Sequence, residues 1–369
     1  MISADEHFMK LALALAARGR GWTSPNPMVG AVLVKKGQVI GKDYHRRAGT
    51  PHAEALVLRE IGLKARGGTL YVNLEPCCHK EKRTPPCTAE ILRAGIRRVV
   101  VGMEDPNPQV SGRGLTRLKD AGVSVISGVL EEEARRFNEA YVKHITTGRP
   151  FVILKIASSL DGKIATASGE SRWITGESAR KEVHRMRAAA DAVMVGSGTV
   201  LSDDPLLTVR GLRKTVLQPL RIVVDGRLKS PLGARIFDTA ANSTLVVTTA
   251  LASPEKVHVL KERGVEVVIQ PGNSGKVDFQ NLLALLGERG INSILVEGGS
   301  ELNAVLLREK IADKVVFFVA PKIIGGQDAV SAVGGVSPKI LSDVVSLRDL
   351  RVRKMGEDLM VEGYVYRDH

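Results

Sequence analysis

One short stretch, from residue 50 to residue 87, constrains this chain more than any other feature. It contains His52-Ala-Glu54, then Pro-Cys77-Cys78-His, and then Pro-Pro-Cys87. One imidazole and two thiolates on separate segments can hold a tetrahedral zinc whose fourth position is open to water, which is the arrangement of catalytic zinc sites. All three cysteines fall in this stretch, so they make a poor disulfide framework and a good metal site.

The spacing assigns a role to each of these residues. We expect His52, Cys77 and Cys87 to be the zinc ligands, in the H-x-E…P-C pattern typical of zinc-dependent deaminases. Zinc lowers the pKa of its bound water toward neutrality. Glu54 can then carry protons between that water, a ring nitrogen and the leaving ammonia. Adjacent residues at a strand end point in opposite directions, so we expect Cys77 to face the metal and Cys78 to be a small buried side chain.

The length and composition bound the class of protein. At 369 residues, with 44% hydrophobic side chains, the chain is long enough for two domains with separate cores. No apolar run approaches the roughly 20 residues that span a bilayer. The charged N-terminus, MISADEHFMK, lacks the features of a signal peptide. We therefore expect a cytoplasmic protein without a membrane partner.

The charge balance of the chain is basic and does not by itself identify a ligand. The chain carries 53 Lys and Arg against 40 Asp and Glu, a net charge of +13. Such an excess can attract phosphate-bearing substrates or nucleic acid, and it can equally be a feature of a soluble surface. Aromatic residues make up only 4% of the chain, so stacking platforms for nucleic acid are not evident. We expect no nucleic-acid partner.

The first part of the chain alternates between strand and helix patterns. A capping box, Ser3 to Glu6, predicts a helix from residue 4 to residue 18. Cys87 is expected to open a helix, where exposed N–H groups favour its thiolate. The other expected elements are strands at 31–34, 38–40, 69–74, 97–102 and 123–126, and helices after Pro51 and over 131–147.

The second part also alternates, without repeating the first. Residues 146–150, TTGRP, are expected to form a linker between domains at 1–147 and 148–369. Strands are expected near 151–157, 191–195, 221–225, 244–249, 265–270, 293–297 and 315–320, with a terminal hairpin about Gly356. The pattern predicts two unrelated α/β domains.

Phosphate-binding motifs in the second part are limited. Residues 195–201, VGSGTVL, lack the third glycine of a dinucleotide fingerprint, which disfavours a Rossmann site. Residues 294–302, ILVEGGSEL, read as a strand, two glycines and a helix start. That arrangement can present free N–H groups to a phosphate.

Several motifs together resemble one family. They are SPNPMVG, GKDYHRRAGTPHAE, LEPCCH, RTPPC and EDPNPQVSGRG in the first part, and KIASSLDGKIA, GESRWIT, TVLSDDPLLTVR and VEGG in the second. The chain resembles the bifunctional riboflavin-pathway enzymes, a diaminohydroxyphosphoribosylaminopyrimidine deaminase fused to a 5-amino-6-(5-phosphoribosylamino)uracil reductase. The loop Lys80–Arg83 is one residue longer than the family's usual run.

The resemblance implies a fold class and a two-step activity. The first domain would have a cytidine-deaminase-like α/β/α fold and the second a dihydrofolate-reductase-like α/β fold. The chain would deaminate 2,5-diamino-6-(5-phosphoribosylamino)pyrimidin-4-one and then reduce the ribosyl group to ribityl with NADPH. The cofactors that the resemblance implies are zinc for the first domain and NADPH for the second. We also expect the chain to form a homo-oligomer.

The resemblance also implies further site residues, by their matching positions. Those implied to contact the deaminase substrate are Asn26, His45, His79, Asp105 and Asn107. Those implied to contact NADPH are Ala157, Trp173, Thr199, Asp203 and Gly299. Those implied to contact the reductase substrate are Ser171, Arg187, Leu207, Arg210 and Glu297.

Residue chemistry alone leaves alternatives at several of these positions. Asn26 can donate to and accept from a pyrimidine edge, or it can simply form a turn. Trp173 can belong to a core, and Lys155 can either polarise the reacting centre or be solvated at a strand end. His144 and His184 are interpreted as structural.

Two other functions remain as alternatives. One is a nucleic-acid base deaminase whose C-terminal half is a binding module, but such an enzyme needs an aromatic and basic channel. The other is a non-enzymatic regulator that retains a zinc, against which the presence of Glu54 argues.

Overall fold

The computed structural model describes residues 3–78, 85–212, 217–240, 242–272 and 274–366. The chain divides into two compact units, Met1–Arg149 and Pro150–His369, which are described separately. Thr147 is the last residue of a helix, so the first two residues of the expected linker are helical instead. No helix in the described residues is long and apolar enough to span a membrane.

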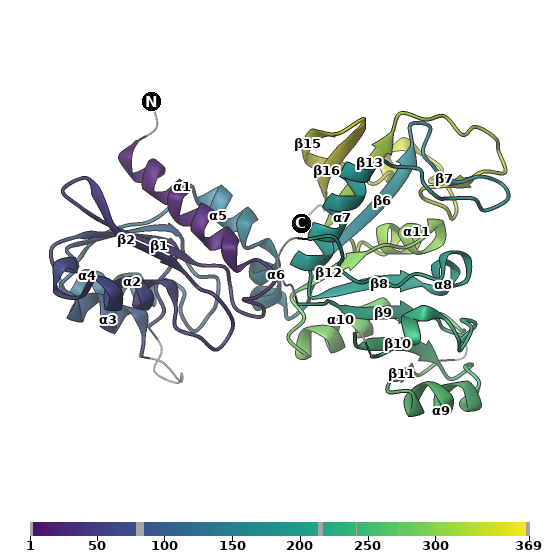
Figure 1. The fold of residues 1–369 in the computed structure, drawn as a ribbon, viewed down its shortest axis with the longest axis horizontal. Coiled ribbons are helices and arrows are strands. Elements are labelled where there is room, and N and C mark those ends of the chain that lie inside the picture. The colour runs from purple at the N-terminus through teal and green to yellow at the C-terminus, as the bar shows by residue number, and fades with distance from the viewer. Residues whose placement is uncertain (1–2, 79–84, 213–216, 241, 273, 367–369) are drawn as a thin grey trace. The chain divides into compact units, whose positions relative to one another are not determined.

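The first unit is one sheet with helices on both faces (Figure 1). Its strands are β1 (Gly30–Lys35), β2 (Gln38–Tyr44), β3 (Thr69–Leu74), β4 (Arg98–Met103) and β5 (Ser124–Ile126). Its helices are α1 (Ala4–Ala16), α2 (Ala53–Ile61), α3 (Cys87–Arg93), α4 (Arg113–Asp120), α5 (Glu131–Phe137) and α6 (Glu139–Thr147), with 3-10 turns at Ala17–Gly19 and Gly62–Ala65.

The strand order in this sheet is β2-β1-β3-β4-β5. β1 pairs antiparallel with β2 and β3, whereas β3, β4 and β5 are parallel. Alternate residues of β1 lie in different cores, because successive side chains of a strand point to opposite faces. Val32 and Val34 pack with α1, and Ala31 and Leu33 pack with α2, α3 and α4. The capping box predicted for α1 is confirmed.

The prediction of one continuous helix over residues 131–147 is wrong in one respect, because the helix is broken at Asn138. This residue has φ −108° and ψ 24°, which lies outside the helical region. Its side-chain amide accepts a hydrogen bond from the N–H of Met28 at 2.9 Å and donates to the carbonyl of Met28 at 3.1 Å. The break therefore lets Asn138 satisfy both backbone groups of a residue far away in the sequence, and that gain is invisible to helix periodicity.

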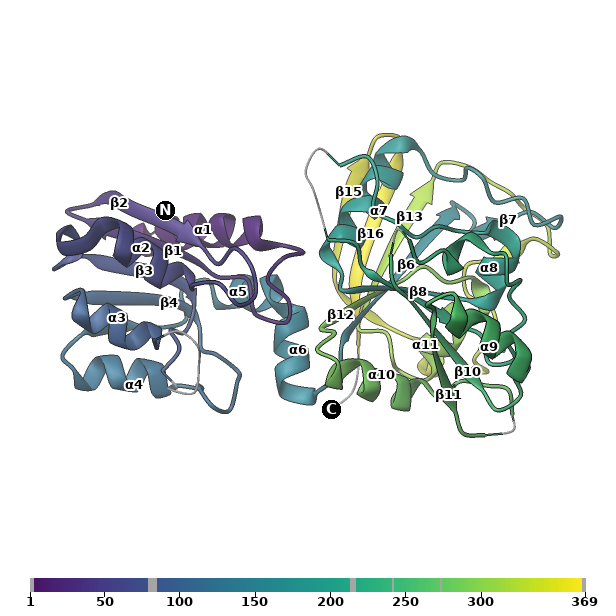
Figure 2. The same cartoon turned by 60° about the horizontal axis from the view of Figure 1, so that its bottom comes forward.

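The second unit is built on a larger sheet (Figure 2). Its strands are β6 (Phe151–Ser159), β7 (Lys163–Ala165), β8 (Ala192–Gly196), β9 (Leu220–Val224), β10 (Thr244–Thr249), β11 (Glu266–Gln270), β12 (Ser293–Val296), β13 (Lys314–Ala320), β14 (Val330–Ser331), β15 (Leu347–Met355) and β16 (Asp358–Val365). Its helices are α7 (Glu177–Ala189), α8 (Ser197–Asp203), α9 (Pro254–Glu262), α10 (Phe279–Glu288) and α11 (Ser300–Arg308), with 3-10 turns at Arg235–Phe237 and Leu341–Asp343.

The main sheet of this unit has nine strands in the order β11-β10-β9-β8-β12-β6-β13-β16-β15. The strands from β11 to β13 are parallel, and the terminal hairpin β15–β16 adds antiparallel to β13. The expected strands and the hairpin about Gly356 are confirmed. The small pair β7–β14 was not expected, because three- and two-residue strands carry no measurable periodicity.

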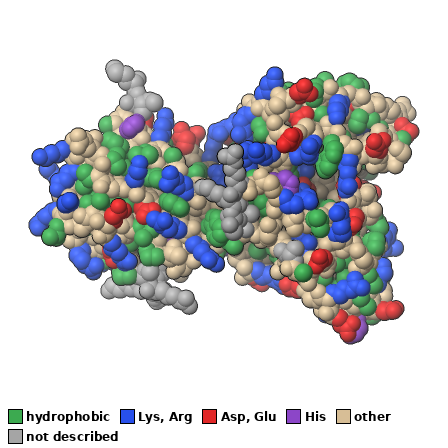
Figure 3. All heavy atoms as spheres, in the orientation of Figure 1, with side chains coloured by type: hydrophobic (Ala, Val, Ile, Leu, Met, Phe, Trp, Pro, Cys, Tyr) green, Lys and Arg blue, Asp and Glu red, His purple; other side chains and the backbone are tan. Residues whose placement is uncertain are grey.

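Helices cover both faces of this sheet, which explains its long apolar strands. α10 and α11 pack on one face, over side chains such as Met194 and Val296. α9 packs on the other face, over side chains such as Val193 and Val246. Strands buried on both faces are typical of parallel sheets. On the face seen in Figure 3, Lys and Arg side chains of each unit are dispersed among acidic and apolar ones.

Candidate functional site

Three predicted metal ligands of the first unit converge. The ligand atoms of His52, Cys77 and Cys87 lie within 4.8 Å of one another. The Nδ1 atom of His52 is 3.2 Å from the sulfur of Cys87 and 3.6 Å from that of Cys77. Tetrahedral bonds of zinc to nitrogen and sulfur place these atoms about 3.5 Å apart. The donor set and its spacing therefore fit a zinc ion.

Short connections from the sheet and the helices position these ligands. His52 is the N-cap residue of α2, with extended backbone, so its side chain lies off the helix end. Cys77 follows β3, and Cys87 is the first residue of α3. The N–H of Cys87 donates to the sulfur of Cys77 at 3.4 Å. As predicted, Cys77 rather than Cys78 joins the cluster; Cys78 is only half-buried, so its expected burial is wrong.

The two ligand thiols differ in their readiness to ionise. A hydrogen bond from Cys87 lowers the pKa of Cys77 to about 3, against the effect of burial, and the neighbouring His52 lowers it further. Donating that same bond, together with burial, raises the pKa of Cys87. The two thiols are hydrogen-bonded to each other, so the ionisation of one depends on the other.

Glu54 lies beside this cluster with one oxygen unsatisfied. Its side chain is 2% exposed, and its Oε2 atom has no hydrogen-bond partner among the described residues. Burial raises the pKa of Glu54. A buried carboxylate oxygen without a partner is costly, and a water molecule held at a metal between the three ligands would satisfy it. The position is that of an acid/base group for such a water.

Glu75 is a functional-site residue that sequence reasoning missed. Its buried carboxylate accepts N–H groups from Asp105 (3.1 Å), Gly112 (2.9 Å), Gly114 (2.8 Å) and Leu115 (3.2 Å). A Cβ atom at Gly114 would lie 2.3 Å from the carbonyl oxygen of the residue after Glu75, so only glycine fits there. Glu75 thereby ties the segment that leads to Cys77 to the loop after β4 and the start of α4. Its place directly before Pro-Cys is the only sequence signal for this role.

Asn26 and His45 form a linked pair next to the metal ligands. The Nδ2 atom of Asn26 lies 3.3 Å from Nε2 of His45, and Nδ1 of His45 lies 3.2 Å from the carbonyl oxygen of Pro51. A carbonyl oxygen only accepts, so Nδ1 carries the proton and Nε2 accepts from the amide. His45 is 2% exposed, and its ring centroid is 5.3 Å from that of His52. The loop that carries Asn26 is fastened by Asn73 and Asn138 through the backbone of Met28.

The remaining deaminase candidates lie in or near the loop after β4. Asp105 is 6% exposed, and its Oδ1 atom accepts hydrogen bonds from the hydroxyl of Tyr141 (2.8 Å) and the N–H of Asn107 (2.9 Å). The side chain of Asn107 accepts the N–H of Gln109 at 3.0 Å. Asp105 therefore holds the loop together. His79 and the loop Lys80–Arg83 lie outside the described residues.

The second unit contains a large cavity at the carboxyl ends of its parallel strands. Its volume is about 1420 Å³, more than the roughly 300–1,000 Å³ of a single small-molecule site. The structure brings all ten residues implied for the second unit into the lining of this cavity. They are Ala157, Trp173, Thr199, Asp203, Gly299, Ser171, Arg187, Leu207, Arg210 and Glu297.

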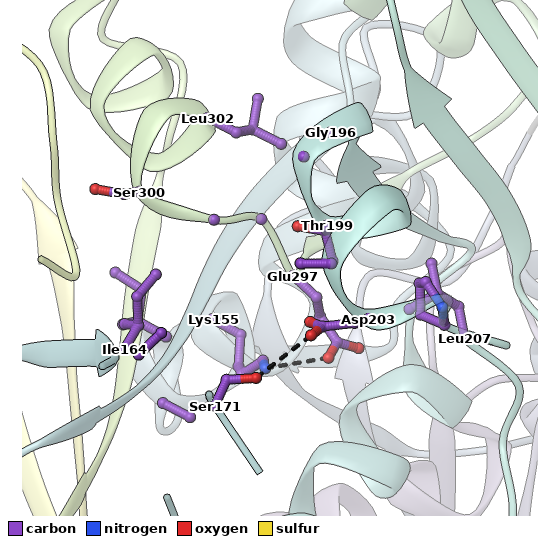
Figure 4. A pocket seen from close by; sticks show the side chains of 18 of the residues that line it. Lys155, Ile164, Ser171, Gly196, Thr199, Asp203, Leu207, Glu297, Ser300 and Leu302 are labelled. Atoms are coloured by element: carbon purple, nitrogen blue, oxygen red, sulfur yellow. Dashed lines mark hydrogen bonds and ion pairs between the residues drawn. The ribbon is translucent and has the colours of Figure 1, made fainter. Parts of the chain in front are cut away.

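A network of buried charges lies at the base of this cavity. Glu297 pairs with Lys155 at 3.1 Å (Figure 4). It also pairs with Nε of Arg187 at 2.5 Å. Burial alone would raise the pKa of Glu297, but the charges of Lys155 and Arg187 outweigh it and hold the pKa at about 2. Lys155 lies within β6 and is not a solvated lysine at a strand end. Two cations around one anion leave this part of the cavity net positive.

Two glycine turns lie opposite this network. Gly196 precedes α8 at the end of β8, and Gly299 precedes α11 after β12 (Figure 4). A Cβ atom at Gly298 would lie 2.8 Å from the side chain of Leu302, so the turn before α11 requires glycine. α11 directs its first N–H groups to this side of the cavity, as a phosphate requires. Ser171 donates to Asp203 at 3.3 Å across the same space.

Trp173 and His184 also line the cavity. Trp173 is 64% exposed and stacks on the guanidinium of Arg180 at 4.6 Å, so it is not a core residue. The sequence interprets His184 as structural; its Nδ1 atom accepts the backbone N–H of Arg210 at 3.2 Å at the wall of this cavity. A lone histidine on a helix carries no sequence signal for such a position.

Comparisons with known proteins assign both units. The cytidine and deoxycytidylate deaminase zinc-binding region matches residues 2–103, which include all three metal ligands. The RibD C-terminal domain matches residues 150–361. The chain is 46% identical to the riboflavin biosynthesis protein RibD of Aquifex aeolicus (strain VF5) over 357 residues, 97% of both chains. It is 41% identical to RibD of Escherichia coli (strain K12), over 96% of this chain and 98% of that one.

Solved structures agree with this assignment. The chain superimposes on form 1 of RibD from Acinetobacter baumannii with a TM-score of 0.89 at 37% identity, covering 100% of both chains. It is similar to a diaminohydroxyphosphoribosylaminopyrimidine deaminase/5-amino-6-(5-phosphoribosylamino)uracil reductase from Thermotoga maritima, with a TM-score of 0.86 and 38% identity over 98% and 99% of the two chains. The fold class expected from the sequence is confirmed for both units.

The metal site makes a direct prediction. The purified chain should contain about one zinc, and His52→Ala or Cys87→Ser should lower the content at least about tenfold, because binding depends on every ligand. Cys78→Ser is the matched control and should retain the metal, since Cys78 lies outside the ligand cluster. Elemental analysis measures all four proteins. Full zinc content in both ligand variants would contradict the assignment.

Proposed function

Since the chain belongs to the RibD family of bifunctional deaminase/reductases of riboflavin biosynthesis, we propose the two reactions in detail. The unit at residues 1–147 removes an amino group from 2,5-diamino-6-(5-phosphoribosylamino)pyrimidin-4-one by hydrolysis. The unit at residues 148–369 then reduces the ribosyl group of the product to ribityl with NADPH. The observation that carries the first step is the unsatisfied Glu54 oxygen beside the three ligands. The charged cavity of the second unit carries the second.

For the deamination, a zinc bound by His52, Cys77 and Cys87 supplies an acidified water. Glu54 accepts a proton from that water as the water oxygen bonds to the amino-bearing ring carbon, and it passes this proton to a ring nitrogen. It then carries the remaining proton of the new hydroxyl to the amino nitrogen, the C–N bond breaks, and ammonia leaves as the ring carbon becomes a carbonyl. Its raised pKa suits a group that must both accept and release a proton near neutral pH. Asn26, which is hydrogen-bonded to His45, orients the pyrimidine edge. His79, Asp105 and Asn107 complete the proposed substrate site.

For the reduction, a nicotinamide cofactor supplies a hydride that ends on C1 of the ribosyl group, while the bond from C1 to the ring oxygen opens and that oxygen takes a proton. Ser171, Arg187, Leu207, Arg210 and Glu297 hold the substrate, with the arginines suited to its phosphate. The ammonium of Lys155, fixed by Glu297, can donate a hydrogen bond to the sugar at the cavity base.

We propose NADPH as that cofactor, bound by Ala157, Trp173, Thr199, Asp203 and Gly299. The glycine turns before α8 and α11 suit the pyrophosphate. In the sheet, β9 is the neighbour of β8, and further lining residues lie at and beyond the end of β9. The adenosine of the cofactor would extend to this side of the cavity. Lys276 lies there without an ion-pair partner among the described residues, so it is a candidate for the extra phosphate of NADPH.

We also propose that the chain is a cytoplasmic homo-oligomer. Large apolar side chains are exposed between residues 323 and 352, including Ile323 (69%), Val336 (96%), Leu341 (87%) and Val352 (61%). β15 is the edge of the nine-stranded sheet, and an exposed apolar edge is a template for association. Sedimentation at micromolar concentration measures the oligomeric state, and a monomer there would rule out the proposal of an oligomer.

The three cysteines form no disulfide in the described residues. Free thiols are in keeping with the reducing compartment that we propose.

The separation of the two sites predicts separable activities. Glu54→Gln should keep the zinc but lower deamination by about 100- to 10,000-fold, because an amide cannot carry a proton. Reduction of supplied deaminated substrate should be unchanged. Glu104→Gln, an exposed change on the same unit, serves as the control. If Glu54→Gln abolished both activities while zinc and fold were retained, the assignment of one reaction to each unit would be wrong.

The cofactor proposal predicts a preference that one substitution weakens. The full-length chain should show a kcat/KM for NADPH about 10- to 100-fold above that for NADH, as expected for a charge-assisted contact to the extra phosphate. Lys276→Met should reduce this ratio without lowering kcat/KM for NADH. Lys261→Met, an exposed change on α9, should leave the ratio unaltered. Equal values for the two cofactors in the unaltered chain would overturn the choice of NADPH.

A further inference from the structure

The backbone around Asn26, the residue proposed to orient the pyrimidine, offers few donors by which the fold can hold it. Both of its neighbours in the sequence, Pro25 and Pro27, lack an N–H group. The N–H of Asn26 itself donates to the carbonyl oxygen of Thr23 at 2.8 Å, within the same loop. The N–H of Met28 is therefore the next backbone donor through which the rest of the unit can hold this loop.

Asn138 binds both backbone groups of Met28. Its Oδ1 atom accepts the N–H of Met28 at 2.9 Å, and its Nδ2 atom donates to the carbonyl oxygen of Met28 at 3.1 Å. A backbone N–H only donates and a carbonyl oxygen only accepts, so the two ends of the amide cannot be exchanged. Asn138 is 2% exposed. One buried side-chain amide therefore fixes both the place and the direction of the backbone at Met28.

Asn73 holds the same loop from the sheet. The pairing of β1 with β3 ends one residue before Asn73. Beyond that point, the Oδ1 atom of Asn73 accepts the N–H of Gly30 at 2.8 Å, and its Nδ2 atom donates to the carbonyl oxygen of Met28 at 3.0 Å. The side chain of Asn73 thus takes the place of a backbone partner where the loop enters β1.

These contacts tie Asn26 to the metal ligands. Pro27 is the only residue between Asn26 and Met28, and its ring fixes one backbone dihedral angle, so a displacement of Met28 moves Asn26 as well. Asn73 lies on β3, four residues before the ligand Cys77. This strand therefore leads to one metal ligand and, through Met28, also holds the residue proposed to orient the pyrimidine.

We propose that Asn138 and Asn73 are positioning residues of the deamination, which hold Asn26 at the place where its side chain meets the pyrimidine edge. This inference rests on the proposed function, because it takes Asn26 as a substrate-binding residue. It also gives a functional reason for the break between α5 and α6 at Asn138. The competing explanation is that the two asparagines only stabilise the fold. The two explanations differ in one measurable way, because only a positioning role disappears when the side chain of Asn26 is removed.

The test is a double-mutant cycle on the full-length, zinc-loaded chain, in which ammonia release from 2,5-diamino-6-(5-phosphoribosylamino)pyrimidin-4-one is measured. Asn138→Leu should lower kcat/KM for deamination about 10- to 100-fold, the effect of a small displacement of an orienting group. Asn26→Ala should lower it by a similar factor. With Asn26→Ala already present, Asn138→Leu should lower it by less than about threefold, because no side chain remains to be positioned.

Further measurements separate this effect from lost stability. For Asn138→Leu, the zinc content and kcat/KM for reduction should be unchanged, whereas the midpoint of unfolding should fall, because the N–H of Met28 loses its partner. Val99→Ala, a change in the core near the start of β4, is the matched control. It should also lower the midpoint of unfolding, but it should leave kcat/KM for deamination unchanged.

Each other outcome overturns the inference. If Asn138→Leu lowered kcat/KM by the same factor with and without Asn26→Ala, or if Val99→Ala lowered it as much, Asn138 would be structural. If Asn138→Leu left deamination unaltered, Asn26 would be positioned without it. If Asn26→Ala alone left deamination unaltered, Asn26 would not bind the substrate.

Two results are distinguished from a failure of the inference alone. If Asn138→Leu does not fold or does not retain zinc, the same cycle and the same criteria apply to Asn138→Ala, which leaves room for a water molecule at the backbone of Met28. If the unaltered chain released no ammonia, the proposed function would fail, and the inference with it. An additive cycle in an active chain would overturn the inference and leave the proposed function intact.

Discussion

Both sites of this protein depend on one constraint, that the carboxyl ends of adjacent parallel strands meet at the same edge of a sheet. In the first unit, β3 leads to Cys77 and its parallel neighbour β4 leads to the loop of Asp105. In the second unit, β6, β12 and β8 are adjacent and parallel, and they bring Lys155, Glu297 and the turn at Gly196 to one cavity. Chain segments far apart in sequence therefore supply one site without any long loop.

Three buried glutamates show how surroundings decide what a carboxylate does. Glu75 is satisfied by four backbone N–H groups, so it fixes the loop after β4. Glu297 is satisfied by Lys155 and Arg187, and it remains ionised in spite of its burial. Glu54 alone keeps an oxygen without a partner among the described residues. Since an unsatisfied buried carboxylate is costly, the position of Glu54 beside the three metal ligands supports the acid/base role proposed for it.

The sequence predicted the regular elements well where local signals are strong. The capping box located the start of α1, and alternation located the strands of both sheets. It failed where a distant partner outweighs local preference. Asn138 leaves the helix between α5 and α6 because its side chain binds Met28.

For the sites, the sequence by itself determined the zinc ligands and indicated the proposed acid/base group, because their spacing within one short stretch is a local property. Motif resemblance supplied ten of the residues that line the reductase cavity. Only the tertiary structure decided which side chains pair: Glu297 with Lys155 and Arg187, Glu75 with the backbone at Asp105, and His184 with the backbone of Arg210. The physical reason is that burial and charge act through distances across the fold, and sequence separation carries no measure of those distances.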